Sequence, residues 1–464
     1  MAGTEQKQSE TRRVIVLRDK KPEVWLRGEG TLHALPELEI PQGQRITEHI
    51  AIAVRENLGI AAVSIAALRA PEGKSCGASI RYNIMESCAP GCESLDAKNW
   101  VPLDLLEPRS FRDVNDFAAI REAVAQLRNN QDKGPFGKQG WFECLRQWVQ
   151  EAIEPHGLRL RGPFRQLNAS AAFSLICFQT NGPPVWFKAT GAPNFHEFRL
   201  TLALSHLFSR SLPHIIDTRP EWNGWLALNA DGIRLNQVPE PNAWTAAAGD
   251  LADLQIASLG RSLLLLEAGA RDLRSAALRN RIEPFFQTMG SLMERQTNVP
   301  PAVLSRMALR TLSTQVSEAL DALDETAIPT ALGHLDLNPG NIVCSPNSAV
   351  FLDWAEGFVG HPFLTFEYHL EYFRRTFGIG HAEEAQMVDR YSARWRALLS
   401  DTVIRRALEG APLVAAFAYA TGNELWKTPG EIEKPRTAAY LRGLTRRMHR
   451  EAQFLADRRR SCLR

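Results

Sequence analysis

Residues 331–354 constrain this chain more than any other stretch. Two short β patterns there flank a polar turn that begins at Ser345. A hairpin folded about this turn returns Asp353 to the side of Asn341, and Asp336 lies in a loop at the same end. Two carboxylates and an amide are therefore expected at one place. Phosphoryl transfer requires such a set: a carboxylate to receive a hydroxyl proton, and oxygen ligands for Mg²⁺.

The spacing H-x-D-x-x-x-x-N, followed by two hydrophobic residues and an aspartate, resembles the catalytic segment of the aminoglycoside phosphotransferases and choline kinases. These families have a fold similar to that of protein kinases. The resemblance covers roughly 156–460 and implies an α+β fold with a β-rich N-lobe and a mostly helical C-lobe. It implies that Asp336 accepts or orients the proton of the attacking hydroxyl, while His334 braces the loop. It also implies ATP as donor, and Mg²⁺ held by Asn341 and Asp353.

A lone lysine marks the expected nucleotide side, in an N-lobe at 156–232. Lys188 ends the apolar strand pattern 185–189, and lysine is rarely buried unless it is paired. Its expected partner is Glu197 on the next helix. In kinase-like folds such a pair positions the α- and β-phosphates. An alternative stays open for Glu197, because it could instead complete a capping box with Asn194.

Further nucleotide contacts follow from the resemblance. Strand patterns at 158–164 and 173–179 are joined by small residues, Ser170 among them, where backbone N–H groups could approach phosphates closely. Leu228 and Asn229 end the last strand pattern of this lobe. In the family, the hinge at this point holds the adenine through its main chain.

Residues 1–110 predict a small leading α/β domain. The order of strand patterns around a helix at 46–58 resembles a Nudix domain, including the closing W-x-x-x-D-x-L element. The Nudix box is mostly missing, since Glu56 alone matches a metal-binding glutamate. Asn57 replaces its neighbour, and Ile52 with the following alanine replaces the Arg-Glu pair. One carboxylate cannot offset the dehydration of Mg²⁺, so the domain is expected not to hydrolyse pyrophosphates. An unrelated α/β cap is the alternative.

Two regions complete the domain plan. Helix patterns at 113–128 and 141–153, with a turn-rich stretch between them, predict a helical linker at 111–155. Residues 233–464 predict the C-lobe, with the catalytic loop, the acceptor site and helices at 244–264 and 304–323.

The acceptor side is less specific. Thr365 stands near the place where the family has a loop-bracing aspartate, and a hydroxyl makes fewer bonds than a carboxylate. Glu367 and Glu371, with neighbouring tyrosines, could form an acidic aromatic wall for a cationic acceptor. A solvated helix face is the favoured interpretation.

The composition of the chain limits which classes of binding partner are expected. The chain has 464 residues with a net charge of +2. Its polar N-terminus lacks a signal-peptide core, and no run of about 18 apolar residues appears. The seven cysteines are scattered, which fits reduced thiols. Cys88 and Cys92 could be half of a zinc site, although a plain loop is favoured. We therefore expect a cytoplasmic protein acting on a small-molecule hydroxyl acceptor, with no membrane or nucleic-acid partner. The oligomeric state stays open.

Two other functions stay open. One is a catalytically idle sensor or scaffold that binds nucleotide, suggested by the missing Nudix carboxylates and by Thr365. The other is a protein kinase or nucleotidyl transferase on the same fold.

Overall fold

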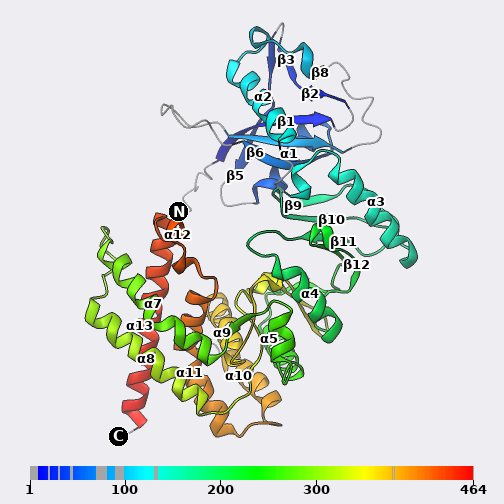
Figure 1. Ribbon diagram of the computed structural model, residues 1–464. Helices are drawn as coiled ribbons and strands as arrows, with labels where there is room; N and C mark the ends of the chain where they lie inside the picture. The colour runs from blue at the N-terminus through cyan, green and yellow to red at the C-terminus, as the bar shows by residue number, and fades with distance from the viewer. Residues whose placement is uncertain are drawn as a thin grey trace, which may run out of the picture. The chain divides into compact units, whose positions relative to one another are not determined.

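The protein is described from a computed structural model (Figure 1). The structure describes residues 9–18, 21–29, 32–41, 45–68, 81–88, 99–129, 134–378, 380 and 382–462. The chain divides into two compact units, Met1–Phe198 with His214–Asn229, and Arg199–Pro213 with Ala230–Arg464. The domain boundaries drawn from the sequence stay a prediction.

The first unit begins with a six-stranded sheet in the order β6-β7-β1-β2-β8, with β5 also paired to β1. Its strands are β1 (Ser9–Arg18), β2 (Glu23–Trp25), β5 (Glu37–Pro41), β6 (Ala62–Leu68), β7 (Arg81–Ser87) and β8 (Trp100–Pro102), and β3 (Arg27–Glu29) and β4 (Leu32–Ala34) form a separate hairpin. The pair β1–β7 is parallel, and the other pairs of this sheet are antiparallel.

One helix covers each face of this sheet (Figure 1). Along β1, Val14 and Val16 belong to the hydrophobic cluster that includes α1 (Ile46–Leu58). Ile15 and Leu17 belong to the cluster that includes α2 (Val114–Arg128). Alternate residues of a strand point to opposite faces, so the two helices lie on opposite sides. The leading region is thus a three-layer α/β sandwich. Its likeness to a Nudix domain stays a prediction.

A five-stranded antiparallel sheet follows, in the order β12-β13-β11-β10-β9. Its strands are β9 (Arg165–Ala169), β10 (Ser174–Phe178), β11 (Val185–Ala189), β12 (Ile215–Arg219) and β13 (Gly224–Leu228). The core of this sheet includes Phe142, Leu145 and Val149 of α3 (Trp141–Ile153). The helices α2 and α3, both placed in a linker by the sequence pattern, therefore complete the cores of different sheets.

The predicted strand at 158–164 is wrong. That segment makes a single bridge, Leu160 to Thr180, and the regular strand is β9. Gly162 has a φ of +68° and Pro163 lacks an N–H, so the alternating apolar pattern cannot continue through them.

The second unit is mostly helical (Figure 1). Helix α4 (His196–Leu207) leads into it, and the later helices are α5 (Pro241–Ala257), α6 (Ser262–Glu267), α7 (Ser275–Glu294), α8 (Arg306–Asp324), α9 (Phe363–Phe377), α10 (Ala382–Trp395), α11 (Asp401–Gly422), α12 (Pro429–Ile432) and α13 (Pro435–Cys462). The predicted helix at 304–323 is confirmed as α8. The predicted helix at 244–264 is broken between α5 and α6, where Gly260 has a φ of +75°. None of the described helices combines the length and apolar character needed to cross a bilayer.

Two small sheets in this unit carry the catalytic segment. One pairs β15 (Arg271–Leu273), β19 (Gly357–Gly360) and β16 (Ala331–His334), and the other pairs β14 (Ile233–Arg234), β17 (Ile342–Cys344) and β18 (Ala349–Phe351). The buried strands β16 and β19 lie inside the largely helical core. The predicted α+β class, with a β-rich part followed by a mostly helical part, is confirmed.

Candidate active site

The predicted hairpin is present. The pairs Ile342–Phe351 and Cys344–Ala349 define its register, and the Ser345 N–H donates to Ser348 O at 2.9 Å across the turn. One residue beyond the ladder, the Leu352 N–H donates to the carbonyl oxygen of Asn341 at 2.8 Å. Asp353 follows at once, so the chain returns it beside Asn341.

Two side-chain amides hold the carboxylate of Asp336. Nδ2 of Asn338 donates to its Oδ1 at 3.0 Å, and Nδ2 of Asn341 donates to its Oδ2 at 3.3 Å and to its backbone O at 2.9 Å. Asn338 also accepts from the Gly340 N–H at 2.9 Å. The sequence interpretation missed Asn338. Its position before Pro339, where an asparagine commonly caps a turn, was the available signal.

His334 is a fully buried brace with a defined tautomer. Its Nδ1 accepts from the Asp336 N–H at 3.1 Å, because a backbone N–H can only donate. Its Nε2 must then carry the hydrogen that goes to Leu352 O at 3.1 Å. Burial lowers the pKa of His334, so the ring is neutral near pH 7. Both nitrogens are occupied, which leaves His334 to position the loop.

Thr365 supplies the support that the sequence pattern left in doubt. Its Oγ1 accepts from the His334 N–H at 2.9 Å, and the side chain is buried in α9. The threonine therefore holds the end of β16, immediately before Asp336. This bond joins residues far apart in sequence, which is why pattern reasoning did not find it.

Glu356, close after Asp353 in the chain, forms an ion pair with Arg271. Asp353 has a left-handed backbone with φ +64° and is exposed, and Glu356 follows three positions later. The Glu356 carboxylate pairs with Arg271 at 3.0 Å, and its backbone O accepts from the Leu335 N–H at 3.0 Å. Burial raises the pKa of Glu356 against the lowering effect of Arg271, and the charges of Asp336 and Asp353 raise it further. The sequence interpretation missed Glu356 and Arg271.

The donor set suits a hard cation. Within the described ranges, no cluster of three or more His, Cys, Asp or Glu side chains is placed to hold a metal ion by itself. Nδ2 of Asn341 donates to Asp336, so Oδ1 is the atom of this amide that can bind a cation. An amide oxygen and the Asp353 carboxylate fit Mg²⁺ when phosphate oxygens complete the shell. Cys88 makes no disulfide, and Cys92, the other half of the suggested zinc pair, lies outside the described residues.

Lys188 and Glu197 form the predicted ion pair in the first unit. Lys188 lies on β11 and Glu197 near the start of α4, and their side chains are 15% and 2% exposed. The Lys188 ammonium also lies 5.8 Å from the ring centre of Trp225. The Glu197 carboxylate is thus engaged by the lysine, while its backbone N–H donates to Asn194 O at 3.1 Å.

The remaining nucleotide-side residues lie at the ends of strands. Ser170 is exposed in the turn from β9 to β10, where its N–H donates to Phe173 O at 2.8 Å. Leu228 ends β13, and Asn229 accepts from the Trp186 indole at 2.9 Å. Asn229 is also the last residue of the first unit before the chain enters the second. Their contact with a nucleotide stays a prediction.

Neither the acidic aromatic wall nor the favoured solvated face is found at Glu367 and Tyr368 of α9. Glu367 is buried and pairs with Arg374 at 3.3 Å, and the hydroxyl of buried Tyr368 donates to a backbone carbonyl. Glu371 pairs with Arg375 at 2.9 Å and with Arg447 at 3.4 Å. Apolar periodicity alone could not show which face of α9 packs inward.

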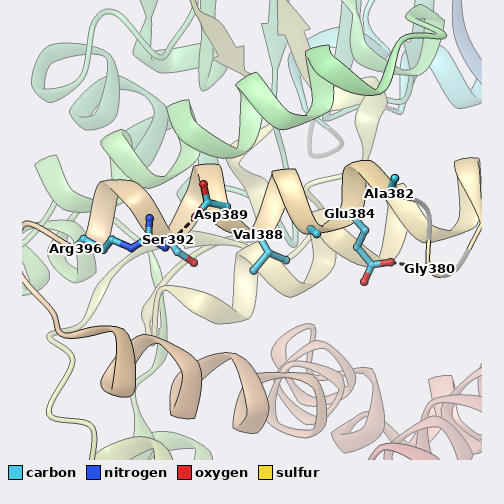
Figure 2. A pocket seen from close by; sticks show the side chains of 8 residues that line it. Gly380, Ala382, Glu384, Val388, Asp389, Ser392 and Arg396 are labelled. Carbon is cyan, nitrogen blue, oxygen red and sulfur yellow. Dashed lines mark hydrogen bonds and ion pairs between the residues drawn. The ribbon is translucent and has the colours of Figure 1, made fainter.

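A shallow hollow of about 530 Å³ runs along α10 (Figure 2). Its charged groups are already paired. Glu384 contacts Arg374 at 2.7 Å, and Asp389 contacts Arg396 at 2.9 Å. No residue of the catalytic segment is among those that line it. The hollow therefore adds nothing to the site.

No protein-family model and no curated protein matches the chain. Among solved structures, it is similar to an ethanolamine kinase from Plasmodium vivax, at 14% identity and a TM-score of 0.45, over 75% of this chain and 94% of that one. It is also similar to a macrolide 2′-phosphotransferase from Brachybacterium faecium, at 16% identity and a TM-score of 0.41, over 64% and 97%. A choline kinase from Streptococcus pneumoniae is similar at 14% identity and a TM-score of 0.42, over 68% and 99%. These are the groups of proteins that the catalytic pattern resembles.

Proposed function

We propose that this protein transfers the γ-phosphate of ATP to a hydroxyl group of a small molecule. One observation carries the proposal. The Asp336 carboxylate is held by the amides of Asn338 and Asn341, at the end of a hairpin that returns Asp353 beside them. This arrangement provides a fixed proton acceptor next to oxygen ligands, as in-line phosphoryl transfer needs.

Asp336 receives or orients the proton of the acceptor hydroxyl as its oxygen attacks phosphorus. Because two amides hold the carboxylate, little reorganisation accompanies the attack. His334 fixes the loop through its two ring nitrogens, and Thr365 fixes the strand end before it. Bound Mg²⁺ would neutralise the charge that develops on the phosphates, with Asn341 Oδ1 and the Asp353 carboxylate as its protein ligands.

On the nucleotide side, Lys188 is the group proposed to hold the α- and β-phosphates. The ion pair with the almost fully buried Glu197 orients its ammonium. The exposed turn at Ser170 and the strand end at Leu228 and Asn229 are proposed to contact the phosphates and the adenine.

The test compares Asp336→Asn with Asp389→Asn, a change at an exposed carboxylate on α10. ADP release is measured with Mg-ATP across a panel of hydroxylated metabolites and antibiotics. We expect Asp336→Asn to lower turnover by about 10²–10⁴-fold with the ATP dissociation constant little changed, because the lost group acts on the proton. Asp389→Asn should match the wild type.

Wild-type turnover in Asp336→Asn would contradict this assignment. Labelled ATP separates the related reactions, because label in the α-position that appears in the product would indicate nucleotidyl transfer. Transfer of the γ-label to protein alone would indicate a protein kinase.

A further inference from the structure

A cavity of about 240 Å³ lies in the first unit, where the leading sandwich meets the five-stranded sheet. Residues from α1, from α3 and from the segment that enters β9 line it. It belongs neither to the catalytic segment nor to the nucleotide-side residues described above. The function proposed for the chain leaves this cavity unexplained.

The cavity is rich in guanidinium groups. Arg55, Arg146 and Arg165 line it, together with one carboxylate, that of Glu48. Glu48 accepts from Arg165 at 2.5 and 3.1 Å. Arg146 bonds Glu143 on its own helix at 2.8 and 3.0 Å. Arg55 is half-buried and makes no ion pair with any residue in the described part of the chain, so its charge is available to an anion.

The walls of the cavity are apolar and aromatic. The rings of Phe142 and Phe164 are 4.4 Å apart, and Phe142 is buried whereas Phe164 is only partly covered. Ile52 of α1 also lines the cavity. This is a position where the Nudix resemblance places a charged residue, so the helix presents an apolar surface here. The flat ring of a bound ligand would cover the part of the Phe164 side chain that remains exposed.

Strand β9 runs from the cavity to the turn that carries Ser170. Gln166, which lines the cavity, is 1% exposed, and its amide bonds both backbone groups of Ser64 on β6, at 2.7 and 3.2 Å. Strand β9 is therefore fixed to the leading sheet at the cavity. At the other end of β9, a hydrogen bond holds the turn to the segment before α3, because the Phe136 N–H donates to Ala171 O at 3.0 Å. A Cβ on Gly134 would lie 2.5 Å from that same oxygen.

We propose that this cavity binds a small phosphate monoester with a flat apolar body, and that the bound ligand stabilises the β9–β10 hairpin. The phosphate dianion meets Arg55 with Arg146 and Arg165 nearby, because guanidinium groups bind phosphate through paired, charge-assisted hydrogen bonds. The ring lies against Phe164. Binding is independent of phosphoryl transfer, whereas the effect on the nucleotide side rests on the proposed function.

The test uses phenyl phosphate as the probe, with inorganic phosphate and benzyl alcohol for comparison. Calorimetry measures affinity for the full chain in the Asp336→Asn background, without ATP, and hydrogen exchange locates the probe. We expect slower exchange in α1 and in residues 162–174, and weaker binding of both comparison compounds. Arg55→Gln should weaken binding of phenyl phosphate about tenfold or more. Arg121→Gln, an exposed arginine on α2, should leave it unchanged.

A second variant tests the ring contact. Phe164→Leu should reduce the affinity for phenyl phosphate toward that for inorganic phosphate. Equal affinity in wild type and Arg55→Gln, or protection confined to the second unit, would overturn the site. Protection of α1 without protection of residues 165–174 would overturn the connection to the hairpin. Probe binding is measured without turnover, and turnover is measured without the probe. A failure of the binding site therefore leaves the proposed function untouched, and a failure of the proposed function leaves probe binding untouched.

Discussion

Gly333 lies directly opposite Phe358 in the β16–β19 ladder, and the ring covers the place where a side chain would be. A Cβ added to Gly333 would be 2.2 Å from Cζ of that ring and 2.5 and 2.6 Å from the two Cε atoms. These separations are roughly 0.9–1.8 Å short of van der Waals contact, which lies at about 3.5–4.0 Å between carbon atoms. Phe358 is fully buried, so it cannot move into solvent.

We therefore expect Gly333→Ala to lower the free energy of unfolding by about 1–3 kcal/mol, the usual cost of overpacking. For a unit of this size each kcal/mol shifts the midpoint of thermal unfolding by about 2–4 °C. Calorimetry should therefore show this midpoint lowered by roughly 2–12 °C. Turnover should fall too, because His334 and Asp336 follow on the same strand and loop.

Gly290→Ala is the matched control. Gly290 lies inside α7 with nothing within 4 Å of an added Cβ, so alanine there should stabilise by about 1 kcal/mol. In the double variant Gly333→Ala with Phe358→Leu, the shorter side chain makes room, and the combined loss should be smaller than the sum. If Gly333→Ala is as stable as the wild type, or is stabilised like Gly290→Ala, the packing argument is refuted.

Two further predictions concern α9. Thr365→Val removes the acceptor for the buried His334 N–H and should cost about 1–3 kcal/mol, with faster hydrogen exchange at that amide. Thr365→Ser keeps the acceptor and should keep the protection, so equal exchange rates in the two variants would count against the brace. Burial raises the pKa of Glu367 from 4.5 to about 7 despite the nearby Arg374. The folded protein thus retains a proton that the unfolded chain releases, and stability should fall by ~3 kcal/mol as pH rises from 4.5 through 7. Glu367→Gln should remove this dependence in denaturation curves recorded across that range, and parallel curves for the two proteins would contradict the assignment.

Local spacing explains what could be predicted from the sequence. A short turn fixes where a hairpin returns, so the places of Asn341 and Asp353 followed from counting residues. The pairing of Lys188 followed from the cost of burying an unpaired charge. In both cases the interacting residues are close in sequence.

Distant contacts could not be predicted in the same way. The bond from His334 to Thr365 spans 31 residues, and the pair Arg271–Glu356 spans 85. Periodicity also placed the first strand of the five-stranded sheet too early, because Leu158 and Leu160 alternate with arginines, whereas the regular strand β9 begins only after Gly162 and Pro163. Such features depend on the tertiary packing of the chain.

The position of α3 has a consequence for synthesis of the protein. This helix packs an aromatic face against a sheet whose strands, β9 to β13, all come later in the chain. At roughly 5–20 residues per second, the ribosome completes those strands roughly 4–15 s after α3. The leading sandwich is already complete by then, and its Glu86 accepts from the Gly140 N–H at 2.8 Å, at the first turn of α3. The leading sandwich can thus serve as the surface that holds the nascent helix α3 until its own sheet has been synthesised.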